Sequence, residues 1–373
     1  MEGSLVMKIL HLADIHIDEK KTVNGKIIYD EEGINIRLKD LLNCISEAKN
    51  TAEKENVSLI LIAGDIFERK TPTPFETYTA TRVLSELGSI CPVVLTAGNH
   101  DAADSIRALG FIENVYVPEP FAPLRFSGVT VFCIPYPDLK EGSPLEVKQF
   151  YEEKILEVSG RLREEGSFLI ALFHGAVEGA TYPVAAGDTG EVTLSAECFR
   201  HLDYVAAGHI HRPQRIKNIY YPGSIDTWRR HEAGEEKGFY ILDTETGSVT
   251  FHRTETRPVV SMDFSLDAIP ESIKVPSGSI VRIEIEVAEE RIGEYSREKI
   301  EGAIEGEPLD VKIVPKIIRT GRVRCEEIVK ARGFDEIITT YMRNKKLREE
   351  KIDRIKEKII KLIKERGLEA RLC

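Results

Sequence analysis

The sequence lacks the features of secreted and membrane proteins. No apolar run approaches the roughly 18 residues of a membrane span. Residues 1–7 have neither the basic region nor the long apolar core of a signal peptide. The six cysteines show no paired spacing, so a disulfide framework is not expected. We therefore expect a cytoplasmic protein with reduced thiols and no membrane association.

Two further absences narrow the class of protein. The chain has no internal repeat or low-complexity segment, and no Gly-x-x-x-x-Gly-Lys-Ser/Thr loop to cradle a nucleotide phosphate. Apolar residues make up 42% of the sequence and charged residues 30%, as in globular proteins. A length of 373 residues usually divides into two or three structural units.

Five short segments each follow an apolar run and carry side chains that can hold a metal. They are Asp14-Ile15-His16, Gly64-Asp65, Gly98-Asn99-His100-Asp101, Phe173-His174-Gly175 and Gly208-His209-Ile210-His211. Four of the preceding runs, at residues 8–12, 58–63, 93–96 and 168–172, are typical of strands buried on both faces. Ligands in layered α/β folds collect beyond the carboxyl ends of strands. The pattern therefore predicts one metal site, built from residues far apart in the sequence.

The residue types in these segments suit a pair of divalent ions. Hydrolysis of a phosphoester needs charge neutralisation at phosphorus and a hydroxide near neutral pH, and two ions roughly 3.5–4 Å apart supply both. A carboxylate can bridge two ions whereas an imidazole cannot, so Asp65 is the candidate bridge. Imidazole, carboxylate and amide ligands suit Mn²⁺, Fe²⁺ or Zn²⁺, and none of the five segments contains cysteine.

Each motif taken singly also has a purely structural explanation. Gly-Asp and Gly-Asn-His-Asp occur in turns, and Asp-x-His after a strand can form a loop hydrogen-bond network. Their common position after apolar runs favours the metal site. His11 lies inside the first apolar run, so we expect it to be a packed core residue.

The motif series resembles the calcineurin-like metallophosphoesterase superfamily over about residues 7–257. Three further features resemble double-strand-break-repair nucleases of the SbcD type, which include the meiotic-recombination-eleven family. These features are Ile134-Pro135-Tyr136-Pro137, the stretch 208–214, and Tyr221-Pro222-Gly223-Ser224 followed by Lys237-Gly238-Phe239. The resemblance implies an α/β fold: a four-layer αββα metallophosphoesterase sandwich, a small α+β capping domain and a C-terminal helical segment.

The same resemblance implies roles for individual residues. One ion would be held by Asp14, His16, Asp65 and His211, and the other by Asp65, Asn99, His174 and His209. Mn²⁺ is the ion expected at both positions. His100 would contact the scissile phosphate and help the leaving oxygen depart, with Asp101 behind it.

Two positions depart from the family pattern. Glu68 stands where the family often has His or Asp, which puts an auxiliary substrate contact at this loop in doubt. Arg229-Arg230-His231 stands where a Ser-Phe-Gly-like run is expected before Glu232. The Glu68 departure leaves the predicted metal site unaffected, and the sequence assigns no role to the second departure.

The chain is expected to contain three regions: a nuclease domain at 7–257, a capping domain at 258–333 and a helical segment at 334–373. In the capping domain, strands are expected at 259–266, 280–287 and 311–318 and a helix at 296–304. By resemblance this domain would orient DNA over the metals; the alternative is a structural appendage. The apolar stripes of the helical segment would bind an SMC-like coiled-coil ATPase of the SbcC type, or would pack on the capping domain.

Two amphipathic helices are expected at 34–53 and 74–87. The corresponding helices of the family form a homodimer through a four-helix bundle, so a dimer is predicted. The alternative is that both helices only cover the sheet.

Basic residues are in the minority, and the net charge is −11. Residues 341–373 carry 12 Lys/Arg against 6 Asp/Glu, which leaves 39 against 56 in residues 1–340. Since phosphate contacts dominate affinity for nucleic acids, this chain alone is expected to bind DNA weakly. A partner subunit would supply much of the affinity for DNA.

These observations predict a dinuclear-metal DNA nuclease that acts in double-strand-break repair and is cytoplasmic and nucleoid-associated. The family suggests 3′-to-5′ exonuclease activity on duplex DNA and endonuclease activity on single strands or hairpins. One alternative is a phosphoesterase for small molecules or phosphoproteins, which would need neither the capping region nor the C-terminal helices. The other is a non-catalytic scaffold subunit, which would not need all seven ligands.

Overall fold

A computed structural model describes residues 7–139, 142–181, 191–227, 229–318, 334–344, 349, 351–356 and 358. By their contacts, the residues form two units. One comprises Met1–Asp263, Pro270–Glu284 and Glu298–Val314, and the other Phe264–Ile269, Ile285–Arg297 and Pro315–Cys373. The predicted domain boundaries at 257/258 and 333/334 stay predictions, and residues 319–333 lie outside the described part of the chain.

The first unit contains two six-stranded sheets. The first sheet has the order β14-β13-β1-β2-β3-β4, in which β1 to β4 are parallel and β13 runs antiparallel to both β1 and β14. Its strands are β1 (Lys8–Leu12), β2 (Leu59–Ala63), β3 (Val93–Thr96), β4 (Val115–Tyr116), β13 (Gly238–Asp243) and β14 (Val249–Arg253). The three expected strands in this sheet are therefore confirmed.

The second sheet has the order β11-β12-β10-β7-β6-β5. Its central strands β12, β10, β7 and β6 are parallel, and the two edge strands are antiparallel to their neighbours. Its strands are β5 (Pro123–Phe126), β6 (Val129–Ile134), β7 (Phe168–His174), β10 (Tyr204–Gly208), β11 (Gln214–Ile216) and β12 (Ile219–Tyr221). A separate short pair is formed by β8 (Ala176–Val177) and β9 (Thr193–Leu194).

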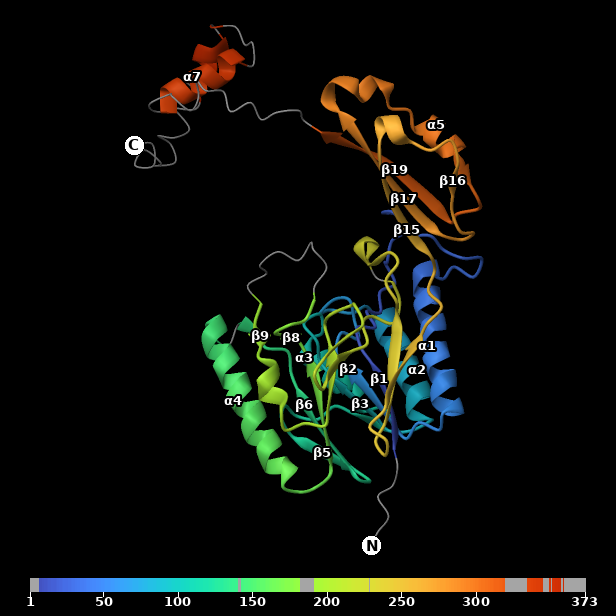
Figure 1. Ribbon diagram of the computed structural model, residues 1–373, viewed down its shortest axis with the longest axis vertical. Helices are drawn as coiled ribbons and strands as arrows, with labels where there is room; N and C mark the ends of the chain where they lie inside the picture. Colours follow the sequence, from blue (N-terminus) through green and yellow to red (C-terminus); the bar gives the residue numbers. More distant parts are fainter. Residues whose placement is uncertain are drawn as a thin grey trace. The chain divides into compact units, whose positions relative to one another are not determined.

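Helices cover the outer face of each sheet (Figure 1). They are α1 (Ile36–Lys54), α2 (Pro74–Gly88) and α3 (Ala103–Leu109) on the first sheet, and α4 (Pro144–Arg163) with the short helix η2 (Ala196–Phe199) on the second. Local sequence determines where α2 begins: Thr73 and Glu76 form a capping box and Pro74 lies in the first turn. The observed α1 and α2 confirm the two expected helices.

Three apolar cores separate the four layers. Alternate residues of β1 face opposite ways: Leu10 packs with the helices of the first sheet, whereas Ile9 packs with Leu172 in the core between the sheets. Beyond the second sheet, Phe173 packs with Ile155 of α4. This is the predicted αββα sandwich.

A smaller sheet follows with the order β15-β17-β19. Its strands are β15 (Val259–Ser265), β17 (Ile280–Ala288) and β19 (Asp310–Ile318). Beside it in sequence are the pair β16 (Ile273–Lys274) and β18 (Ile304–Glu305) and the helix α5 (Arg297–Gly302). The expected strands and helix of this region are thus present.

Near the C-terminus, the chain forms the helix α7 (Phe334–Asn344), and residues 351–356 are also helical. The other residues of the predicted helical segment, 345–348, 350, 357 and 359–373, lie outside the described part of the chain. Of the helices that are described, none has the length and apolar character to cross a membrane.

Candidate metal centre

All seven predicted ligands come from segments at the carboxyl ends of parallel strands. Asp14 and His16 follow β1, Asp65 follows β2 and Asn99 follows β3 in the first sheet; His174 ends β7, and His209 and His211 follow β10 in the second. The run before His209 is therefore also a strand, which the sequence pattern had not identified. The two sheets present these ends to one another, as expected for ligands in layered α/β folds.

The ligands for the first predicted ion are close together. One ligand atom each from Asp14, His16 and His211 lie within 4.8 Å of one another, and so do those of Asp14, Asp65 and His174. The Nε2 atoms of His16 and His211 are 3.1 Å apart. Asp14 thus lies beside both halves of the site, and its carboxylate accepts the backbone N–H of His209.

The ligands for the second predicted ion converge on Asn99. His174 Nε2 and His209 Nδ1 each lie 3.0 Å from Asn99 Oδ1. His174 Nδ1 lies 2.7 Å from the main-chain oxygen of Ala63, which can only accept, so this nitrogen carries a proton. Its Nε2 therefore has a free lone pair in the neutral ring. His209 Nε2 lies 2.5 Å from a carboxylate oxygen of Glu191, which can only accept, so the ring proton lies on Nε2 and Nδ1 keeps its lone pair.

This donor set fits divalent cations. A proton on Nδ1 of His211 is held by Glu232, 2.7 Å away, so the His211 Nε2 lone pair faces the same space as that of His16. With the rings neutral, four imidazole lone pairs, two carboxylates and an amide oxygen would repel one another without a cation to share them. Carboxylates and carbonyls behind metal-ligating histidines fix the ring tautomer in the way seen here.

The backbone at the site is strained. Asp14, His16, Asp65 and His209 have φ of 51°, 51°, 52° and 99°, a region that L-residues rarely adopt. Such conformations cluster at functional sites, where the surrounding structure holds them. Gly98 and Gly208 permit the close approach, because a β-carbon at Gly98 would overlap the Asp65 carboxylate and one at Gly208 would overlap the main-chain oxygen of Ala63.

Burial and neighbouring charges shift the pKa values of the site residues in opposite directions. Burial lowers the pKa of His174, but the adjacent Asp65 carboxylate outweighs burial and raises it to about 9. Burial acts to raise the pKa of Asp65, and His174 and His16 outweigh it and hold that pKa far below its usual range. The same opposition, with His211 and Lys237 as the stabilising groups, keeps the pKa of Glu232 low. Asp65 and Glu232 are therefore carboxylates at neutral pH.

His100 lies beside the ligands. Its backbone N–H donates to Asp65 Oδ1 at 2.9 Å, and its Nδ1 lies 2.6 Å from the main-chain oxygen of Glu68. A carbonyl only accepts, so Nδ1 is protonated and Nε2 is the atom available to a substrate. The side chain is 28% exposed.

Asp101 does not take the predicted position behind the His100 ring. Its carboxylate oxygens accept the backbone N–H groups of Ile66, Phe67 and Gly98 at 3.0–3.2 Å, and among the described residues no hydrogen bond joins the two side chains. Burial and the nearby Asp65 raise the pKa of Asp101 to about 6. Asp101 thus holds the loop after β2 in place, and the contact behind His100 is a main-chain carbonyl.

Glu68 lies between two site histidines. Its Oε2 is 3.1 Å from His16 Nδ1 and 3.8 Å from His100 Nδ1. With these two rings it forms a third cluster of ligand-type atoms within 4.8 Å. The departure at this position therefore changes the surroundings of His16 and His100.

Two carboxylates at the site had no predicted role. Glu232 was noted only as the end of an unusual run, and Glu191 lies in no motif. Tyr136, from the Ile-Pro-Tyr-Pro segment, also joins the site: its ring centre is 5.7 Å from that of His209, and its hydroxyl is 3.4 Å from Glu191. No local sequence signal links Glu191 to His209, because tertiary packing alone brings them together.

Comparison with known proteins agrees with this geometry. Residues 7–213, more than half of the chain, match the calcineurin-like phosphoesterase family. The chain is 28% identical over 297 residues to the SbcD component of nuclease SbcCD from Staphylococcus epidermidis, covering 72% of this chain and 76% of that one. It is 22% identical over 388 residues to the SbcD component from Escherichia coli, covering 93% and 94%.

A third relative is the DNA double-strand break repair protein Mre11 of Methanopyrus kandleri. It is 27% identical over 270 residues, covering 65% of this chain and 55% of that protein. These relatives bear the names that the motif series suggested, so the predicted resemblance is confirmed. The chain belongs to the calcineurin-like phosphoesterase family.

Proposed function

We propose that this protein is a DNA nuclease of the SbcD and Mre11 type that uses two divalent ions, with Mn²⁺ as the expected metal. The observation that carries the proposal is the convergence of seven ligand side chains, with His100 beside them. The names of the relatives, which are nuclease components and a double-strand break repair protein, support DNA as the substrate.

In this proposal, Asp14, His16, Asp65 and His211 hold one ion, and Asp65, Asn99, His174 and His209 hold the other. When bound, the ions neutralise phosphate charge and supply an activated water. The protein's own residues fix the geometry. Asp65 is held by the backbone N–H of His100, and Glu232, Glu191 and the Ala63 carbonyl hold three of the ligand rings in one tautomer.

His100 serves the leaving group in this mechanism. Its Nδ1–H is anchored on the Glu68 main-chain oxygen, so its Nε2 can face the phosphodiester that the metals hold. A protonated ring would donate from Nε2 to the departing 3′-oxygen, and positioned acids of this kind contribute about 10²–10⁴-fold to rates. Asp101 contributes indirectly, through the loop that carries Asp65.

The protein is proposed to work with partners. An SMC-like ATPase of the SbcC type would bind the segment 334–373 and give ATP-driven access to DNA, since the chain has no nucleotide-binding loop of its own. A homodimer would form through α1 and α2, and Phe75 and Tyr78 of α2 are 46% and 62% exposed. The net charge of −11 agrees with weak DNA binding by this chain alone.

A cleavage assay tests the proposal. Metal-stripped protein is given Mn²⁺ or Mg²⁺ and end-labelled duplex, single-stranded and hairpin DNA, beside a chromogenic phosphodiester. We expect Mn²⁺-dependent DNA cleavage, with 3′-to-5′ shortening of duplexes, that is lost in Asp65→Ala. Turnover of the small ester with all DNA intact would instead favour a small-substrate phosphoesterase. No turnover of any ester with metals bound would favour the scaffold alternative.

A further inference from the structure

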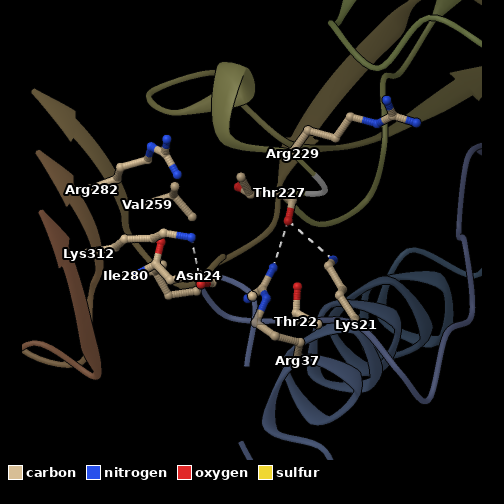
Figure 2. A pocket seen from close by; sticks show the side chains of 11 residues that line it. Lys21, Thr22, Asn24, Arg37, Thr227, Arg229, Val259, Ile280, Arg282 and Lys312 are labelled. Atoms are coloured by element: carbon tan, nitrogen blue, oxygen red, sulfur yellow. Dashed lines mark hydrogen bonds between the residues drawn. The ribbon is translucent and has the colours of Figure 1, made fainter. Parts of the chain in front are cut away.

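A cavity of about 240 Å³ in the first unit is lined by five basic side chains. Lys21 comes from the loop after β1, Arg37 from α1, Arg229 from the segment after β12, Arg282 from β17 and Lys312 from β19 (Figure 2). None of these residues is a predicted metal ligand. Among the described residues that line the cavity, none is acidic.

The two most buried of these cations share one carboxylate. Lys21 and Arg37 are 7% and 2% exposed, and both bind the same Asp226 carboxylate, at 3.1 and 2.8 Å. Both also donate to the main-chain oxygen of Thr227, as Figure 2 shows. Arg37 has a second carboxylate, Asp40, 2.6 Å away.

The Asp40 carboxylate has a second cationic partner. Arg257 contacts both of its oxygens, each at 2.7 Å. In the described part of the chain, Lys21, Arg37 and Arg257 thus converge on the carboxylates of Asp226 and Asp40. Burial and the Arg37 charge outweigh the attraction of Asp226 and lower the pKa of Lys21 to about 8. A further anion near Lys21 would favour its charged form.

The outer cations of the cavity have even fewer acidic partners. Among the described residues, the hydrogen-bond partner of Lys312 Nζ is the main-chain oxygen of Asn24, at 3.2 Å. Arg229 is exposed and forms no hydrogen bond or close ion pair with any residue of the described part of the chain. Arg282 is paired along its own strand with Glu284, 3.0 Å away. The cavity thus presents a surplus of positive charge in a protein whose net charge is −11.

We propose that this cavity binds the phosphate group of a nucleotide. A phosphate offers oxygens on several sides, which suits cations that approach from separate elements. Thr22 and Thr227 add hydroxyl groups to the wall, and Val259 and Ile280 add an apolar side on which a sugar or base can rest. The nucleotide is either free or part of a DNA strand, because the two share this chemistry.

The first test measures binding to the full chain in EDTA, so that no metal can hold the phosphate. The probes are inorganic phosphate, deoxyadenosine monophosphate and a fluorescent single-stranded oligonucleotide. The variant Arg229→Gln with Lys312→Gln removes two cations that form no salt bridge within 4.0 Å among the described residues. The control, Arg161→Gln with Lys274→Gln, removes the same two charges at exposed positions outside the cavity.

We expect the cavity variant to bind at least tenfold more weakly than wild type, and the control to stay within twofold. If the mononucleotide shows this difference, the ligand is a free nucleotide. If only the oligonucleotide shows it, the cavity holds a strand phosphate, and the salt dependence of oligonucleotide binding will be shallower in the variant. Equal binding of every probe by variant and control would overturn the proposal.

A second measurement needs no variant. Acetylation of Lys312 and Lys274 in the wild-type chain is followed by mass spectrometry, with and without the probe that binds. We expect the probe to slow acetylation of Lys312 severalfold and to leave Lys274 unchanged; equal slowing at both would contradict the proposal. Because these tests exclude metal, their outcome is independent of whether the chain cleaves DNA.

Discussion

The Nε2 atoms of His16 and His211 face each other at 3.1 Å. Behind them, the Nδ1 atoms lie 3.1 Å from Glu68 and 2.7 Å from Glu232. Carboxylates attract the ring proton to Nδ1, so both Nε2 atoms present lone pairs to the same space. Two lone pairs at this distance repel unless they share a cation. With both ring protons on Nδ1, the two Nε2 atoms are placed to share one cation, as the predicted metal site requires.

Glu232→Gln should weaken metal binding. The substitution removes the charge that orients His211, and carboxylates behind metal ligands typically contribute about 10–100-fold to affinity. Titration of Mn²⁺ into the metal-stripped variant measures the loss. Glu235→Gln is the matched control. Lys237 contacts both Glu232, at 2.9 Å, and Glu235, at 3.4 Å, but Glu235 has no contact with His211 among the described residues. A similar loss in both variants would show that the effect comes from Lys237.

His100→Ala should separate metal binding from cleavage. The ring lies outside the seven ligands, so the variant should keep its full metal content. Cleavage should fall by about 10²-fold or more, since the leaving oxygen loses its acid. Metal analysis and DNA cleavage are measured on the same preparation. Metal loss that matches the activity loss would mean that His100 is a ligand.

His11 should make stability sensitive to acid. Burial lowers its pKa from 6.5 to about 3, and its Nδ1 lies 2.9 Å from the Tyr204 hydroxyl. Below pH 6.5, His11 is protonated in the unfolded chain, whereas in the folded chain it stays neutral down to about pH 3. The contribution of His11 is thus present above pH 6.5 and is lost as pH falls, by about 1.4 kcal/mol per unit.

Denaturant unfolding in EDTA checks this expectation. Between pH 6 and 4.5, His11→Phe with Tyr204→Phe should lose about 2 kcal/mol less stability than Tyr204→Phe alone. Equal losses would mean that His11 is protonated in the folded protein. His11 is fully buried, as the sequence predicted for a core residue.

The proposed dimer can be tested on α2. Phe75→Asp with Tyr78→Asp places two charges on the exposed apolar part of this helix, and light scattering should show a monomer where wild type is a dimer. Phe150→Asp with Leu145→Asp on α4 is the control, since these residues are 54% and 64% exposed on a helix of the other sheet. Wild type that is monomeric at micromolar concentration would contradict the dimer.

Local patterns in the sequence predicted the strands and the ligand segments, and the family resemblance supplied the αββα arrangement. Apolar runs identify strands, and residues such as Asp65 and His174 stand directly at their ends. The contacts that hold the ligand side chains in place could not be predicted in the same way. Glu191 lies beside His209 although β9, η2 and β10 separate the two residues in the sequence. His174 is held by the main-chain oxygen of Ala63, a group that every residue carries.

Asp101 does not take the position behind His100 that the family resemblance implied. It follows His100 directly, yet the turn after β3 directs its carboxylate to the backbone N–H groups of Ile66 and Phe67. Buried N–H groups need acceptors, and this carboxylate satisfies them. The basic cavity was equally hidden, because its cations come from five separate segments.

The most direct test of the account is the anomalous scattering of Mn²⁺ in crystals of this protein. The account predicts two peaks, one on each side of the Asp65 carboxylate, with His16 and His211 on one and His174 and His209 on the other. The third cluster, at Glu68 and His100, should stay free of metal. A single peak, or a peak at Glu68 with none at His174 and His209, would contradict the dinuclear site.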